Sequence, residues 1–315
     1  MTLNDGNSVY LKAVLANLIV QVVFSIVFST VALMLNPASP STEIPSTLNI
    51  VVMILIQVAF LVAILTTVGK NRVELPFVKK QKISVVGALL AVATAVVLIC
   101  CFSWIAEWFA ILLHAIGYKS SGIEFNGALD WALGILAVVV IAPIIEETVF
   151  RSALLGGLKT RYGNAVSVAL CGLCFALMHM SAEQTVYQFI LGCVCAIVAI
   201  SSGSYVYSII IHATSNLIAL FLPYVPLVTP KDGNVSVLLE NVALSIPVTI
   251  ALALVGMALI WLIARVYLKK RAQDAVVEKQ EQSEKKGLLS GNMTLVIGIV
   301  VCAVMWVSNA LVALV

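Results

Sequence analysis

Long apolar segments recur along the whole chain, and they constrain its fold more than any other feature of the sequence. A helix needs about 18 or more apolar residues to cross a hydrocarbon core of ~30 Å. Backbone groups inside that core find no water, so a spanning segment has to be helical. The sequence therefore predicts an all-α, polytopic transmembrane helix bundle of about eight to nine spans. The candidate segments cover residues 9–35, 48–69, 83–116, 129–158, 164–181, 184–201, 204–222, 241–264 and 291–315.

The composition agrees with a membrane protein and disfavours other classes. Of 315 residues, 62% are hydrophobic and 10% are charged, whereas about a quarter of the residues of a soluble domain are charged. The net charge of +3 is small and no Lys/Arg stripe is interleaved with aromatics, so we expect no nucleic-acid partner. All seven cysteines lie in apolar segments, which favours free, buried thiols over disulfides.

The loops between these segments alternate in their content of basic residues. Odd-numbered loops such as 36–47 and 223–240 carry almost no Lys or Arg. Because cytoplasmic loops are enriched in Lys and Arg, the even loops are predicted to be cytoplasmic, and so is the N-terminus. Residues 9–35 are then a retained first span rather than a signal peptide. The basic residues of the even loops are Lys70, Arg72, Lys79, Lys80, Lys82, Lys159, Arg161, Arg265, Lys269, Lys270, Arg271, Lys279, Lys285 and Lys286.

Three clusters of polar residues interrupt the apolar segments in the middle of the chain. They lie at residues 146–151, 175–179 and 212–216. Ionisable groups at membrane depth are rare and costly, so each cluster is a candidate functional site. Counted from the cytoplasmic ends of three helices, their key residues lie between ~12 and ~22 Å inside the bilayer. Polar groups at similar depths on three helices predict one buried site.

Helical spacing separates the two glutamates of the first cluster. Glu147 and Arg151 are four residues apart on one face, so they can form an ion pair. Glu146 is rotated by about 100° and lacks that partner, which leaves its carboxylate available as a general base.

The other two clusters present imidazole rings and an amide. His212 and Asn216 are four residues apart and face one volume, where both can donate hydrogen bonds to a developing oxyanion. Phe175 lies one helical turn before His179 and is expected to wall the site.

Each cluster also has a structural interpretation. Glu147 with Arg151 can be a packing salt bridge, and His212 with Asn216 can join helices by hydrogen bonds. Glu146 alone can serve as a proton-relay or ion-binding carboxylate.

The ordered motifs EExxxR, FxxxH and HxxxN resemble those of the CAAX protease and bacteriocin-processing family of intramembrane proteases. This family, also called CPBP or Abi, is related to the type II CAAX prenyl endopeptidase. The resemblance covers about residues 128–220. It implies a protease in which Glu146 and His179 activate water. His212 and Asn216 would bind the oxyanion, and Glu147 with Arg151 would support the site.

The family is commonly labelled as metalloproteases, so a zinc site is the alternative to a metal-free one. Glu146, His179 and His212 could hold zinc with an open fourth position. No HExxH motif is present, and Asn216 is a poor zinc ligand. The sequence therefore favours a site without a cofactor, with zinc possible.

These observations predict an intramembrane endopeptidase whose cavity opens to the cytoplasm. Its partners would be the lipid bilayer and a peptide or membrane-protein substrate. It would lie in the plasma membrane if the source is prokaryotic. The competing class is a non-catalytic membrane protein, such as a bacteriocin immunity protein, a scaffold or a small-solute carrier.

The same features divide the chain into five parts. The expected layout is N-terminal transmembrane helices over 1–127, the catalytic core over 128–222, a further span over 223–268, a charged cytoplasmic linker over 269–290 and a last span over 291–315.

Overall fold

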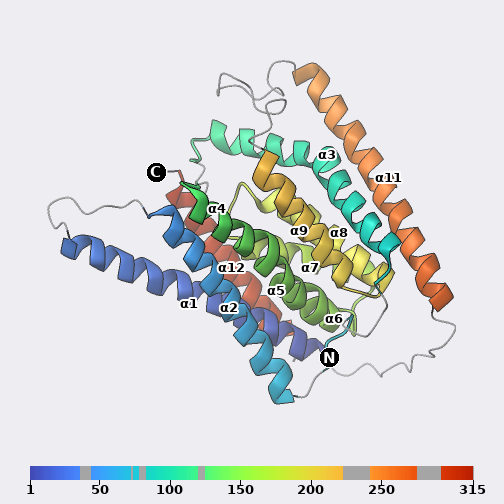
Figure 1. Ribbon diagram of the computed structural model, residues 1–315, viewed down its shortest axis with the longest axis horizontal. Helices are drawn as coiled ribbons and strands as arrows, with labels where there is room; N and C mark the ends of the chain where they lie inside the picture. The colour runs from blue at the N-terminus through green and yellow to red at the C-terminus, as the bar shows by residue number, and fades with distance from the viewer. Residues whose placement is uncertain are drawn as a thin grey trace.

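The computed structural model describes residues 1–35, 44–71, 74–77, 83–119, 125–222, 242–274 and 292–314, and they form an all-helical bundle (Figure 1). The loops expected outside at 36–47 and 223–240 lie largely beyond the described residues, as does most of the linker. The first residues of that linker, 269–274, are helical. The helices are α1 Leu3–Leu35, α2 Ser46–Asn71, α3 Val85–Ala115, a continuous helix Ala128–Leu158, α7 Asn164–Met178, α8 Thr185–Ser202, α9 Val206–Phe221, α11 Val242–Asp274 and α12 Asn292–Val312.

Seven of these helices are long and apolar enough to cross a membrane. The two shorter ones are α7, with 15 residues, and α9, with 16. At 1.5 Å per residue they reach about 22 to 24 Å, less than the thickness of the hydrocarbon core. All nine apolar segments are therefore helical, but the two that carry histidine motifs are too short to span on their own.

The continuous helix Ala128–Leu158 has two π-helical interruptions. It runs through α4 Ala128–Gly134, η1 Ile135–Ile141, α5 Ala142–Glu147, η2 Thr148–Leu154 and α6 Leu155–Leu158. Pro143 lies in the first turn of α5 and has no N–H to donate. π-Helical turns are frequent at functional sites, and here one of them carries Arg151.

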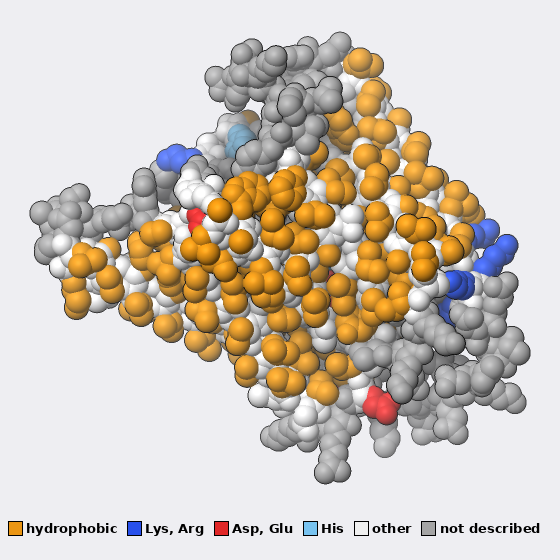
Figure 2. All heavy atoms as spheres, viewed as in Figure 1, with side chains coloured by type: hydrophobic (Ala, Val, Ile, Leu, Met, Phe, Trp, Pro, Cys, Tyr) orange, Lys and Arg blue, Asp and Glu red, His pale blue; other side chains and the backbone are white. Residues whose placement is uncertain are grey.

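Contacts between helix ends place five of the described basic residues at one end of the bundle. Arg271 at the end of α11 donates to Ile200 O near the end of α8, and Gly6 in α1 packs against Gly157 in α6. Lys and Arg gather at this end in Figure 2. We call it the basic end; its members are Lys159, Arg161, Lys269, Lys270 and Arg271.

Other contacts gather the remaining helix termini at the opposite end. Asp130 at the start of α4 accepts a bond of 2.5 Å from the Ser46 hydroxyl at the start of α2. Trp306 near the end of α12 donates to the Thr185 hydroxyl at the start of α8. Successive helices therefore run in alternating directions, which agrees with the alternation of basic loops in the sequence.

The outer surface is apolar and the polar groups are inside. Large side chains such as Leu65, Leu254 and Val304 are more than half exposed, and the face in Figure 2 is covered by hydrophobic side chains. Glu147, Arg151 and His212 are buried in the interior instead. This inversion of the usual soluble pattern fits helices surrounded by lipid, and the chain is an integral membrane protein.

Candidate active site

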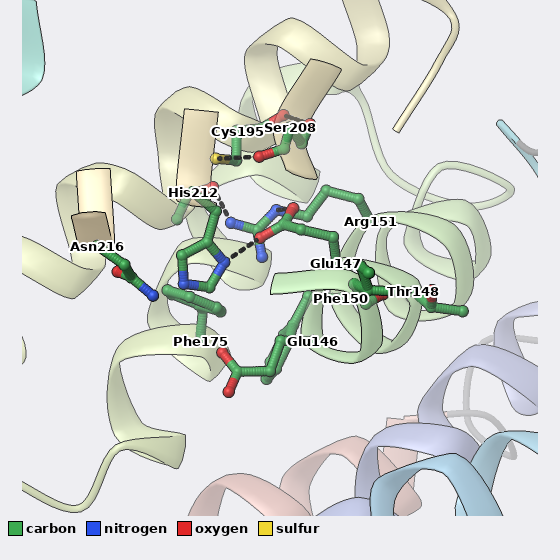
Figure 3. Close-up of polar contacts among 12 residues, drawn as sticks. Glu146, Glu147, Thr148, Phe150, Arg151, Phe175, Cys195, Ser208, His212 and Asn216 are labelled. Atoms are coloured by element: carbon green, nitrogen blue, oxygen red, sulfur yellow. Dashed lines mark hydrogen bonds and ion pairs between the residues drawn. The ribbon is translucent and has the colours of Figure 1, made fainter. Parts of the chain in front are cut away.

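Glu147 in α5 lies at the centre of the buried cluster and has two partners. Its Oε2 lies 3.0 Å from Arg151 Nε, so the ion pair expected from their spacing is confirmed. Both side chains are fully buried, and the contact is one of charge rather than an aligned hydrogen bond. The second partner is His212 of α9, whose Nδ1 lies 3.0 Å from Glu147 Oε1 (Figure 3).

The bond to Glu147 fixes the orientation of the His212 ring. A carboxylate accepts hydrogen bonds, so Nδ1–H of His212 donates to Oε1 and the other ring nitrogen, Nε2, is left for the site. Nε2 becomes a donor only when the ring holds a proton on both nitrogens. In that form the positive charge of the ring faces the Glu147 carboxylate.

Arg151 contacts α8 at a point where α8 and α7 lie very close together. Its Nη2 donates to Gly192 O at 3.4 Å. A Cβ added to Gly192 would lie 2.9 Å from Gly172 Cα, so only glycine permits this contact between α8 and α7. The guanidinium carbon also lies 4.5 Å from the centroid of the Phe175 ring, within the range of a cation–π interaction.

Phe175 of α7 contacts both imidazole rings. Its centroid lies 4.9 Å from that of His179 and 5.5 Å from that of His212, both at steep interplanar angles. In Figure 3 the ring lies between His212 and Glu146. Its role as a wall of the site stays a prediction.

His179 caps the C-terminal end of α7. Its Nδ1 lies 2.8 Å from Phe175 O. A carbonyl can only accept, so Nδ1 carries the hydrogen and Nε2 keeps a free lone pair. Glu146 and His212 are both close enough to interact electrostatically with this ring. The structure therefore brings the three motifs into one cluster.

Polar residues of α1 hold the turn that carries His179. Met180 has a φ of 52°, in the left-handed region that a non-glycine residue adopts at a cost of about 1–2 kcal/mol. Asn17 Nδ2 donates to Met178 O at 3.3 Å, and Gln21 Nε2 donates to Asn17 Oδ1 at 2.8 Å. These bonds from α1 help to fix a turn that is otherwise strained.

Asn216 of α9 donates to the backbone carbonyl of Val138, which has no partner within its own helix. The N–H of Ala142 bonds Ala137 O, and Pro143 has no N–H, so neither can reach Val138 O. Asn216 Nδ2 donates to this oxygen at 2.8 Å. The amide has a second hydrogen, which stays available to the site.

Arg151 pairs with Glu147 and not with Glu146, as the helical spacing predicted. Glu146 has a neutral partner instead, because Gln57 Nε2 of α2 donates to Glu146 Oε1 at 2.7 Å. Helical spacing within one helix could not indicate this donor on a neighbouring helix. Glu146 Oε2 remains buried without a partner.

The arrangement does not fit a preformed three-ligand zinc site. Among the described residues, no group of three His, Cys, Asp or Glu side chains lies in a position to hold a metal ion. The bonds of His179 and His212 engage Nδ1 in both rings and leave each Nε2 free.

The site lies deep below the basic end. At 1.5 Å per residue, Glu146 is ~18 Å from the end of α6 and His179 is ~22 Å from the start of α7. His212 is ~9 Å from the start of α9, and Asn216 is ~15 Å from it. The short helices α7 and α9 therefore place their polar residues at membrane depth, where protein rather than lipid surrounds them.

A hollow of about 280 Å³ lies near the opposite end of the bundle, bordered by Met180, Ser181 and Asn309. It adjoins the turn that follows His179. Lys119 and Ala313, which also line it, are joined by a backbone hydrogen bond of 2.8 Å.

Three amides that contact the site were missed in the sequence. Asn17 and Gln21 lie in the first apolar segment and Gln57 in the second, outside every motif. The sequence did hold a signal for them, because an amide side chain inside a transmembrane helix needs a hydrogen-bond partner on another helix. The partner could not be named without the packing of α1 and α2 against the core.

The fold and the cluster define an integral membrane protein with a carboxylate and imidazole site enclosed by its helices. Residues 128–218 match the profile of the family described as type II CAAX prenyl endopeptidase Rce1-like. The matched segment runs from α4 into α9 and includes all three motifs. It confirms the relationship to the CAAX proteases that the motifs predicted. No curated protein and no solved structure matches the chain.

Proposed function

We propose that the protein is an intramembrane endopeptidase in which Glu146 and His179 activate water for hydrolysis of a peptide bond. The family match supports a CAAX-type protease. The mechanism rests on two acceptor atoms of one cluster that have no hydrogen-bond partner. Glu146 Oε2 has no partner, and the bond from His179 Nδ1 to Phe175 O leaves Nε2 unengaged.

The chemistry is a general-base attack by water. The water oxygen bonds to the peptide carbonyl carbon as Glu146 takes one of its protons, and the carbonyl π electrons move onto oxygen. His179 Nε2 accepts the other O–H and orients the water. Glu146 then gives its proton to the leaving nitrogen as the C–N bond breaks, which releases an amine and a new carboxyl group.

His212 and Asn216 are the donors for the oxyanion in this proposal. The second amide hydrogen of Asn216 and the Nε2–H of doubly protonated His212 would reach the negative oxygen. Glu147 holds the His212 ring in place and balances its charge. Arg151 balances Glu147 in turn, so both act through His212 rather than on the substrate.

His212→Ala and Asn216→Ala are each expected to lower kcat by about 10²- to 10³-fold with little change in KM, as for lost oxyanion donors. The measurement is steady-state hydrolysis of a peptide in detergent or vesicles. Thr214→Val is the matched control, because it changes a polar residue of the same helix about 200° away from His212. A raised KM at unchanged kcat would assign the two residues to substrate binding instead.

The proposed orientation places the basic end and the N-terminus in the cytoplasm, with the cavity opening at that end. The excess of Lys and Arg supports it, and His212 is nearer to this end than to the other. We expect a membrane-impermeant thiol reagent added outside to label Ala115→Cys and not Lys269→Cys, two exposed positions at opposite ends. Both should react once the membrane is permeabilised. The reverse pattern would invert the topology and move the opening to the hollow beside Met180.

The proposed function is tested by comparing membranes that contain the wild type with membranes that contain Glu146→Gln. Mass spectrometry of membrane peptides should find cleavage products with the wild type alone. A farnesylated peptide ending in CAAX and its unprenylated form, offered to purified protein, show whether a prenyl group is needed. Identical peptides from both membranes would favour an immunity protein, scaffold or carrier.

The same hydrolysis run with a chelator decides between the metal-free site and zinc. We expect activity to survive chelation. Zinc bound in near-stoichiometric amounts, removed together with activity and restored with it, would reassign Glu146, His179 and His212 as ligands.

A further inference from the structure

A glutamine outside the family-matching segment contacts the proposed general base. Gln57 lies in the middle of α2, and the residue is only 7% exposed. Its Nε2 donates to Glu146 Oε1 at 2.7 Å. The matched segment begins at residue 128, so this contact joins the motif-bearing core to the N-terminal helices.

The chemistry of the pair fixes which way the amide points. A carboxylate offers only acceptors, so the nitrogen of Gln57 has to face Glu146. The carbonyl oxygen of Gln57 and the second oxygen of Glu146 then lie on either side of the hydrogen bond. Both atoms are buried without a partner.

Burial of an unbonded acceptor costs about 1–3 kcal/mol, so two in one contact are unusual in a purely structural pair. A pair that only joined two helices would be expected to satisfy these atoms within the protein. Acceptors left free beside a candidate base suit a site that receives donors, such as the O–H groups of water or the N–H groups of a peptide.

We propose that Gln57 is a positioning residue for Glu146, and that α2 therefore completes the active site. This inference rests on the proposed function. The bond to Oε1 fixes the rotation of the carboxylate and leaves Oε2 as the single oxygen that takes the proton of the attacking water. Gln57 takes no proton itself, and its free carbonyl oxygen is an acceptor for a peptide N–H of the substrate.

The first arm of the test needs no substrate. Gln57→Leu, Glu146→Gln and the double variant are compared by thermal unfolding in detergent, and the two single effects should be non-additive because the residues are in contact. Infrared difference spectra against Glu146→Gln isolate the Glu146 carboxylate band, which should shift in Gln57→Leu. Thr67→Val, a buried polar residue of the same helix without contact to Glu146, should leave the band unchanged.

The second arm measures hydrolysis of the farnesylated CAAX peptide. Gln57→Leu should lower kcat about 10- to 100-fold, the size expected when a base is misplaced, while Thr67→Val keeps it. Exchange of the two groups, Gln57→Glu with Glu146→Gln, should recover stability but not turnover, because the carboxylate is then on the wrong helix. A purely structural bond would give the same kcat in Gln57→Leu as in the wild type once both are folded.

Additive stability effects together with an unshifted carboxylate band would overturn the inference. So would an unchanged kcat in Gln57→Leu. The wild-type protein can also fail to hydrolyse any peptide while the stability effects are non-additive and the carboxylate band shifts. That result would count against the proposed function and not against the contact of Gln57 with Glu146.

Discussion

Glu146→Gln and His179→Ala are each expected to abolish turnover while leaving the protein folded. Glu146→Gln keeps the size of the side chain and removes the base. His179→Ala removes the lone pair that orients the water, and the bond from Nδ1 to Phe175 O is lost with it. The measurement is single-turnover hydrolysis, with thermal unfolding of each variant as the check on folding.

The double variant tests whether these two residues act as one unit. Groups that act together cannot be removed twice, so its activity should be close to that of either single variant. Glu107→Gln, the same chemical change at an exposed glutamate of α3, serves as the control and should retain full activity. A double variant slower than either single variant by the product of their effects would assign Glu146 and His179 independent roles.

The helices themselves were predictable because lipid leaves the backbone no alternative. Every apolar segment of the sequence is helical in the structure, and the alternation of basic loops agrees with the alternating helix directions. The early end of α7 was not predictable. No proline or glycine marks the turn at 179–184, which depends on the left-handed Met180 and on bonds from Asn17.

Within the site, contacts inside one helix were predictable and contacts between helices were not. The ion pair of Glu147 with Arg151 follows from their spacing, and it forms. The bond from His212 to Glu147, and that from Asn216 to Val138, depend on how α9 packs against the interrupted helix. The residues grouped by the motif resemblance lie in one cluster of the structure, but the resemblance could not supply Gln57, which lies in a separate helix.

Arg151→Ala is expected to destabilise the protein by about 3–5 kcal/mol, because it leaves the fully buried Glu147 without its permanent counter-charge. The variant also loses the contact of the guanidinium with Phe175. Arg151→Ala with Glu147→Gln should recover part of the stability, since the uncompensated charge is gone. Thermal unfolding in detergent measures both.

Arg265→Ala is the matched control for the buried arginine. Its guanidinium carbon also lies over an aromatic ring, 3.9 Å from the centroid of Trp261, but the side chain is exposed. An exposed cation–π contact contributes about 0.5–1 kcal/mol, so its loss should be small. Equal losses in the two variants would mean that Arg151 stabilises the protein through its ring contact alone. In that case the charge of Glu147 would be balanced elsewhere, and the role of Arg151 in holding His212 would have to be abandoned.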